Sequence, residues 1–182
     1  MTVEQQASPR KIAFLVAAEG IEQVEFTQPW EALKAAGWQP ELISPETGRV
    51  QAYNHLDKGD TFPVDQTVGQ ARPEDYSALV LPGGVANPDA LRMDQDAVAF
   101  VRDYMASERP VAAICHAIWT LVEAECVKGR TLTSWPSLET DVRNAGGDWV
   151  DREVVIDGNL ITSRNPDDIP AFNKALLDAL DQ

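Results

Sequence analysis

The 182-residue chain has little of what metal-binding and disulfide-rich domains require. It contains only two cysteines, Cys115 and Cys126, and only two histidines, His55 and His116. No Cys-x-x-Cys pair is present, and the histidines are not at metal-ligand spacing from the cysteines. This pattern argues against a structural zinc site and against a disulfide framework. We expect the chain to use neither a metal nor another cofactor.

Positive charge is also scarce. The chain has 15 Lys and Arg residues against 29 Asp and Glu residues, which gives a formal net charge of −14. A surface of this sign repels phosphate backbones and anionic lipid headgroups. We therefore expect neither a nucleic-acid partner nor a membrane partner.

Long apolar runs are missing. The longest early run, residues 12–18, is far shorter than the roughly twenty residues that a membrane-spanning helix needs. The first ten residues are polar and lack the apolar centre of a signal peptide. We expect a soluble, cytoplasmic protein with a polar tail over residues 1–10 and a single domain over residues 11–182.

Short apolar runs alternate with helical patterns along the chain. The runs predict strands at 11–17, 39–45, 76–81, 111–115 and 131–135. Helical patterns follow at about 23–37, 94–106, 116–129, 137–145 and beyond Asn165. Residues 48–63 indicate a hairpin or loop, and Asp157-Gly158-Asn159 a second hairpin. The alternation predicts an α/β fold with a parallel, doubly wound sheet and helices on both faces.

The stretch around Cys115 indicates a functional centre. An apolar strand ends there and a helical pattern begins, and the small residues Ala113 and Ala117 flank the cysteine at two positions' distance. A nucleophile elbow has this steric requirement, and the start of a helix favours a thiolate. The alternative is a core cysteine, because free cysteine is among the most buried residue types.

Three polar features follow strands whose carboxyl ends should meet at one edge of the sheet. They are the Glu19–Glu22 segment, the Gly83-Gly84 turn and Cys115 with His116. Ligands of open parallel sheets bind at this edge. The backbone N–H groups of Gly84 and His116 are candidate donors to an oxyanion.

Glu22 is the candidate acid beside the cysteine. An ionised carboxylate would raise the pKa of the thiol, so we expect Glu22 to be neutral and to donate a hydrogen bond to the sulfur. A solvated glutamate on a loop is the alternative. Glu19 and Glu25 are nearby competitors that sequence spacing leaves open.

His116 is the candidate base, although adjacent residues on a helix do not face each other. It can reach Cys115 if the elbow is strained. Otherwise it points sideways and is oriented by a carboxylate of this or another subunit, for which Asp89 is the candidate. We interpret His55 as a surface residue and Cys126 as a packing residue.

Several separated motifs resemble the ThiJ/PfpI superfamily, and most closely its PfpI branch. They cover nearly the whole chain beyond the first ten residues. They comprise Ala-Ile-Cys115-His, Leu-Pro-Gly-Gly84, Glu22-Gln-Val-Glu-Phe, Lys128-Gly-Arg, Asn144-Ala-Gly, the run Asp151–Arg164 and Pro166-Asp-Asp-Ile-Pro-Ala-Phe.

The resemblance implies a flavodoxin-like three-layer sandwich, related to class I glutamine amidotransferase domains, that forms a homodimer or a larger homo-oligomer. It implies that Cys115 is the nucleophile, that Glu22 is a protonated donor to it and that His116 is the adjacent histidine. Asp89 aligns with an acidic residue that some members contribute across a subunit boundary. Two departures stand out: the usual Cys-His-Gly-Pro has Ala117 and Ile118 here, and Asp89 is shorter than the glutamate of the founding protease.

Three functions follow from these residues. The leading hypothesis is a stress-response enzyme in which a Cys115 thiolate attacks reactive carbonyls, with glyoxalase or deglycase chemistry. The second is an intracellular cysteine peptidase that uses Cys115 and His116, with an acidic residue from another subunit. The third is an oxidative-stress sensor that works through oxidation of Cys115.

Overall fold

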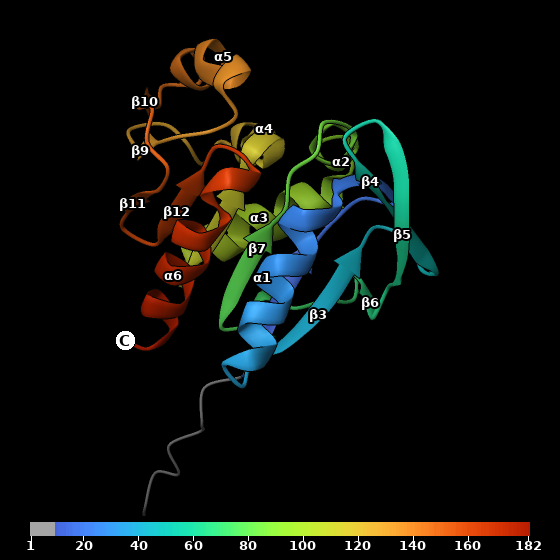
Figure 1. The fold of residues 1–182 in the computed structure, drawn as a ribbon. Coiled ribbons are helices and arrows are strands. Elements are labelled where there is room, and N and C mark those ends of the chain that lie inside the picture. The colour runs from blue at the N-terminus through green and yellow to red at the C-terminus, as the bar shows by residue number, and fades with distance from the viewer. Residues whose placement is uncertain (1–9) are drawn as a thin grey trace, which may run out of the picture.

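The computed structural model describes residues 10–182 (Figure 1). The tail expected over residues 1–10 therefore lies, apart from Arg10, outside the described part. Within that part, no helix is both long and apolar enough to span a bilayer.

A seven-stranded sheet forms the centre, with the strand order β11-β12-β8-β7-β1-β3-β6 (Figure 1). All neighbouring strands are parallel except β11 and β12, which form an antiparallel hairpin at one edge. The predicted α/β fold with a mainly parallel, doubly wound sheet is thus confirmed. The strands are β1 (Lys11–Leu15), β3 (Gln39–Ser44), β6 (Gln66–Thr67), β7 (Ala78–Leu81), β8 (Val111–Ile114), β11 (Val155–Asp157) and β12 (Leu160–Ser163).

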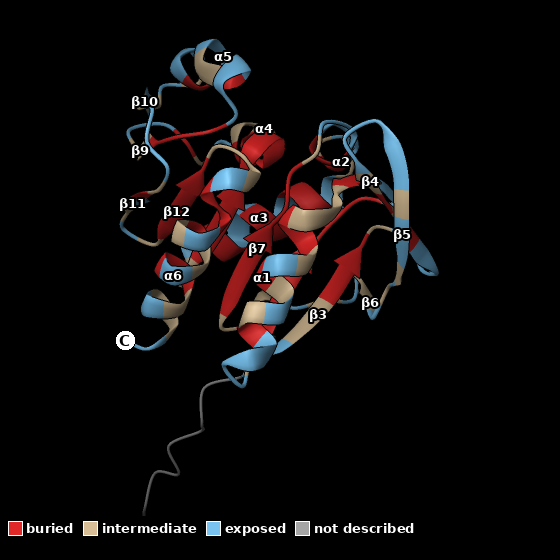
Figure 2. Ribbon diagram, in the orientation of Figure 1, coloured by how far each residue is buried: buried red, intermediate tan, exposed pale blue. Residues whose placement is uncertain are grey.

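Strands β7 and β8 are apolar throughout, and β1 is apolar beyond Lys11, because helices cover both of their faces (Figure 2). Alternate residues of β1 point into two separate cores, with Phe14 in one and Leu15 in the other. Helices α1 (Gln23–Ala35) and α6 (Ile169–Leu180) pack on the first core. The second is covered by α3 (Gln95–Ala106) and α4 (Ile118–Glu123).

The remaining elements surround the carboxyl ends of the central strands. Strands β2 (Glu19–Glu22), β4 (Arg49–Asn54) and β5 (Asp57–Pro63) form a three-stranded sheet, which confirms a hairpin in the polar segment 48–63. The strand expected at 131–135 is only β9 (Thr131–Leu132), paired with β10 (Asp148–Trp149) outside the central sheet. The short helix α2 (Ala86–Leu91) was not expected, and α5 is Glu139–Asn144.

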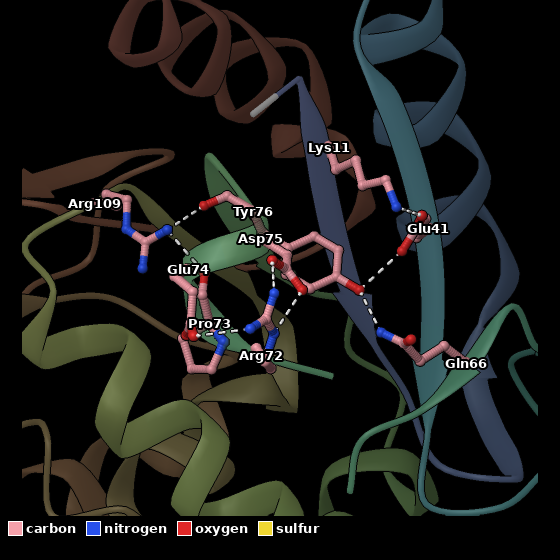
Figure 3. Close-up of polar contacts among 9 residues, drawn as sticks. All are labelled: Lys11, Glu41, Gln66, Arg72, Pro73, Glu74, Asp75, Tyr76 and Arg109. Atoms are coloured by element: carbon pink, nitrogen blue, oxygen red, sulfur yellow. Dashed lines mark hydrogen bonds and ion pairs between the residues drawn. The ribbon is translucent and has the colours of Figure 1, made fainter. Parts of the chain in front are cut away.

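A polar network lies near the opposite, amino ends of β1, β7 and β8 (Figure 3). Tyr76 donates its hydroxyl to Glu41 at 2.8 Å, and Gln66 donates to the same hydroxyl at 3.1 Å. Lys11 forms an ion pair with Glu41 at 2.6 Å. Arg109 donates to the backbone carbonyl of Tyr76. In this network the polar side chains have protein partners.

Candidate active site

Cys115 lies directly after β8, where the chain turns sharply. Its backbone is left-handed, with φ of 65°, and it begins the short 3-10 turn Cys115–Ala117 that leads into α4. This conformation costs a residue with a side chain roughly 1–2 kcal/mol. The strained elbow expected from the sequence is therefore present. Only 6% of Cys115 is exposed.

The strain brings His116 onto the cysteine. The Sγ atom of Cys115 lies 3.1 Å from Nδ1 of His116, which ordinary helical geometry would not allow for adjacent residues. The imidazole packs against the indoles of Trp119 and Trp135, with ring centroids 5.3 and 5.5 Å away. Burial lowers the pKa of His116, so a neutral ring that can accept a proton faces the sulfur.

Glu25, and not Glu22, is the acid beside the sulfur. Glu25 lies in the first turn of α1, is fully buried and interacts with the side chain of Cys115. Its Oε1 accepts a hydrogen bond from the N–H of Gly83 at 3.1 Å. Glu25, one of the two competitors of Glu22 that the sequence leaves open, therefore occupies the position predicted for Glu22.

Among the described residues, no cation acts on Glu25 to keep it ionised. Burial, followed by the charge of Glu22, raises the pKa of Glu25 to about 8. Within residues 10–182, no group donates a hydrogen bond to its buried Oε2 atom. A carboxylate would leave that oxygen unsatisfied, whereas a protonated carboxyl has its own hydrogen to donate. These features favour the neutral form of Glu25, which is the form of carboxyl that we expect beside the thiol.

Glu22 lies at the end of β2 and faces the hairpin. Both of its carboxylate oxygens accept from the backbone N–H of His55, at 3.1 and 3.3 Å. The expectation that Glu22 donates to the sulfur was wrong because these contacts hold its carboxylate at the hairpin turn. Glu22 still lines the pocket over Cys115.

The thiol itself is less acidic than we expected. Burial, and then the charge that Glu25 carries when ionised, raise the pKa of Cys115. The backbone N–H groups of His116 and Gly84 oppose this shift by donating to the sulfur. The expectation of a freely ionised thiolate is therefore not met. Both amides predicted as oxyanion donors lie close enough to the sulfur to favour its thiolate, and their role as oxyanion donors stays a prediction.

The Gly83-Gly84 turn makes this close approach possible. A Cβ atom on Gly83 would lie 2.5 Å from Oε1 of Glu25 and 2.7 Å from Cβ of Cys115. Gly84 has a φ of 83° and would meet the carbonyl oxygen of Gly20. Side chains at either position would therefore separate the acid from the sulfur or displace β2.

A pocket of about 450 Å³ opens over Cys115. Its lining includes Glu19, Glu22, Tyr53, His116 and Trp135. A volume of this size fits a small molecule or a single side chain. The described residues include no group of three or more His, Cys, Asp or Glu side chains placed to hold a metal ion.

The lining of this pocket includes neither Asp89 nor Cys126. Asp89 is on α2, with its side chain well exposed and paired with Arg92 at 3.2 Å. In this chain His116 is held by indoles, and the role of Asp89 across a subunit boundary stays a prediction. Cys126 is partly buried and its Sγ donates to the carbonyl of Ala124 at 3.3 Å, as a packing residue would.

The sequence is similar to those of known proteins over nearly its whole length. The model of the DJ-1/PfpI family matches residues 10–179. "Protein/nucleic acid deglycase 2" of Escherichia coli is 40% identical, over 92% of this chain and 96% of that protein. Two proteins of Bacillus subtilis are also similar. "General stress protein 18" is 39% identical (95% and 99% covered), and "Putative cysteine protease YraA" is 36% identical (94% and 98% covered).

The fold also matches solved structures. A two-domain protein from Anabaena variabilis, with DJ-1/ThiJ/PfpI-like and ferritin-like domains, superposes with a TM-score of 0.88 at 33% identity. The match covers 93% of this chain and 48% of that protein, so this chain spans about half of its length.

Proposed function

The chain belongs to the DJ-1/PfpI family, and on that premise we propose that it is an enzyme that attacks small reactive carbonyls, or their adducts with amines, through Cys115. The observation that carries this proposal is the placement of three groups at one pocket. A thiol, a buried carboxyl and a neutral imidazole meet at Cys115, Glu25 and His116. The deglycase name of the Escherichia coli relative supports this choice of chemistry.

The first step of the proposed reaction is addition of the thiol to an aldehyde. The sulfur forms a bond to the carbonyl carbon, the C=O π bond breaks, and the thiol proton passes to the oxygen, giving a hemithioacetal. His116 and Glu25 are the groups that can carry this proton, since one faces the sulfur at 3.1 Å and the other has a pKa of about 8. The sulfur thus loses its proton during attack, which agrees with its raised pKa.

For a 2-oxoaldehyde, the second step moves a proton from the hemithioacetal carbon to the neighbouring carbonyl carbon through an enediol. The product is a thioester on Cys115, and water hydrolyses it to a 2-hydroxy acid and the free thiol. An adduct of the aldehyde with an amine enters the same sequence when the thiol displaces the amine. The N–H groups of Gly84 and His116 are placed to stabilise the oxyanions that form.

Consumption of methylglyoxal by purified protein tests this proposal. We expect turnover to lactate by the wild type and by Cys126→Ala, and at least a hundredfold loss in Cys115→Ala. Equal rates in the wild type and Cys115→Ala would refute it. Lactate formed in water labelled with ¹⁸O should carry the label in its carboxylate, because the thioester is hydrolysed.

Peptidase activity is the second candidate, favoured by the two amides that face the sulfur and by the name of the second Bacillus subtilis relative. We rank it lower because attack on an amide needs a stronger nucleophile than attack on an aldehyde, and burial raises the pKa of Cys115. Cleavage of peptide libraries that disappears in Cys115→Ala would reverse this ranking.

A sensor function of Cys115 is less well supported, since susceptibility to oxidation follows thiolate character and exposure. Mild peroxide followed by intact-mass and peptide analysis tests it, and selective oxidation of Cys115 over Cys126 would support it. The homo-oligomer, the role of Asp89 within it and the cytoplasmic location stay predictions, and sedimentation of the full chain tests the first.

A further inference from the structure

Asn87 is a fully buried polar residue of the short helix α2, and the lining of the pocket over Cys115 does not include it. Buried polar side chains need hydrogen-bond partners, and this one has three. Its Oδ1 accepts from the N–H of Ala17 at 2.7 Å, and its Nδ2 donates to the carbonyls of Pro82 at 2.9 Å and Gly83 at 3.1 Å. The amide therefore connects α2 with the segments that follow β1 and β7.

The partners of this amide explain why the residue is an asparagine. The N–H of Ala17 needs an acceptor, whereas the two carbonyls need donors, and an amide offers an oxygen on one side and an NH₂ group on the other. Aspartate has the same shape, but its carboxylate cannot donate to the carbonyls. Leucine is branched at the same carbon and has neither group.

The two carbonyls belong to the peptide units that supply N–H groups to the active site. The carbonyl of Pro82 shares a peptide unit with the N–H of Gly83, and the carbonyl of Gly83 shares one with the N–H of Gly84. These peptide units are trans and planar, so the C=O and N–H of each point in opposite directions. By holding both carbonyls on its own side, the Asn87 amide directs both N–H groups to the other side of the turn.

The reacting groups lie on that other side. The N–H of Gly83 donates to Oε1 of Glu25 at 3.1 Å, and the N–H of Gly84 favours the thiolate of Cys115. Two consecutive glycines have no side chains to hold this orientation, and glycine adopts many backbone conformations. The backbone N–H of Glu22 also donates to the Gly83 carbonyl, but at a longer distance of 3.4 Å. The turn therefore depends on contacts from outside it.

We propose that Asn87 is a positioning residue, whose side-chain amide aims the N–H groups of Gly83 and Gly84 into the active site. It acts on the reaction through the turn, without lining the pocket. The inference deepens the proposed function and rests on it, because the N–H of Gly84 is one of the two donors proposed for the oxyanions.

Methylglyoxal kinetics on Asn87→Asp and Asn87→Leu test this role. Both replacements lack the NH₂ group, and only the first brings a charge. We expect kcat to fall at least about tenfold in both, with KM within about twofold, because an oxyanion donor is misaligned while the pocket lining is unchanged. A loss confined to Asn87→Asp would be an effect of charge and would overturn the inference. If Asn87→Leu does not fold, Asn87→Ala replaces it in every assay.

Asn159 offers a matched control at the opposite, amino ends of β8 and β12. Its Nδ2 also donates to two carbonyls, those of Met105 at 3.3 Å and Arg109 at 2.9 Å. Its Oδ1 accepts from Arg130 at 3.1 Å. Asn159→Asp and Asn159→Leu should lower Tm but keep kcat within about twofold. Equal losses of kcat from the two positions would overturn the inference.

Alkylation of Cys115 by iodoacetamide at pH 8, in a Cys126→Ala background, measures the donor without turnover. A misdirected Gly84 N–H no longer favours the thiolate, so Asn87→Leu should slow alkylation at least about threefold. Loosened packing alone would expose the buried thiol and speed the reaction, and a faster or unchanged rate would overturn the inference. Absence of methylglyoxal turnover in the wild type would refute the proposed function instead, and the alkylation rates would then decide the inference by themselves.

Discussion

Two clusters of ionisable side chains lie at opposite ends of the central sheet. They differ in whether their glutamate has hydrogen-bond and ionic partners. At the amino ends, Glu41 has a lysine and a tyrosine hydroxyl as partners (Figure 3). At the carboxyl ends, Glu25 is more deeply buried, and within residues 10–182 it has neither a cationic partner nor a donor to Oε2. The first carboxylate has a cation and a hydroxyl donor as partners, whereas burial raises the pKa of the second.

This difference separates a structural role from a chemical one. Groups whose hydrogen bonds are satisfied contribute to the free energy of unfolding, and they have no free donor or acceptor for a substrate. Groups that are buried, strained or unsatisfied cost stability and cluster at functional sites. Cys115, with its left-handed backbone, and Glu25, with its raised pKa, are of the second kind. Variants that remove one group from each cluster in turn test this interpretation.

The largest expected effect is the difference in kcat/KM between two single variants, Glu25→Gln and Glu41→Gln. Glu25→Gln keeps the contact with Gly83 but removes the proton that is exchanged with Cys115, so kcat/KM for methylglyoxal should fall by at least about a hundredfold. Glu41→Gln should leave kcat/KM within twofold. Steady-state kinetics on both variants, with circular dichroism to verify folding, checks this. Comparable losses in both would show that the clusters do not differ as we propose.

The pH dependence of stability should come next in size. The folded protein keeps the proton of Glu25 up to a pKa of about 8, whereas the unfolded chain loses it near 4.5. Between these values the folded state binds more protons, so the contribution of Glu25 to the free energy of unfolding falls as pH rises.

Urea unfolding of the wild type and Glu25→Gln at pH 5.5 and 7.5 measures this contribution. The stability of the wild type relative to Glu25→Gln should decrease by about 2 kcal/mol between the two pH values. Glu41→Gln, which changes a glutamate at the opposite end of the sheet, serves as the control and should show no such decrease. A constant difference for Glu25→Gln would mean that the carboxyl ionises normally.

The smallest effect is expected from Tyr76→Phe at the amino ends. This change removes the hydroxyl that donates to Glu41 and accepts from Gln66, and it should cost about 1–2 kcal/mol of unfolding free energy. Activity at 25 °C should be unaffected, since the network does not touch the pocket. Thermal unfolding and methylglyoxal kinetics on one preparation test both statements. A loss of activity without a loss of stability would contradict the structural role.

Much of the fold was readable from periodicity, because the buried strands are short apolar runs and the long helices have clear stripes. The exceptions are elements whose conformation depends on tertiary contacts. Helix α2 has six residues, too few for a periodic signal. Beyond β9 the chain leaves the strand, and Trp135 stacks on His116. Such segments carry little local information.

The site shows the same limit. The small residues that flank Cys115 predict the elbow, whereas the prediction of Glu22 as the acid beside the sulfur is wrong, because Glu25 interacts with Cys115. A signal did exist: Glu25, Pro29 and Leu33 are spaced by four residues and all lie on the buried stripe of α1. Glu22 precedes the helix and does not share that stripe. The strain that turns His116 towards the sulfur, by contrast, depends on the folded backbone.

The central claim is that Glu25 keeps its proton at neutral pH beside Cys115. Carbon-13 NMR of protein labelled at the glutamate side-chain carboxyl tests it directly, with the Glu25 resonance assigned by its absence in Glu25→Gln. We predict a chemical shift of a protonated acid at pH 6 and a titration midpoint near 8. A midpoint near 4.5, the ordinary value for glutamate, would contradict the account.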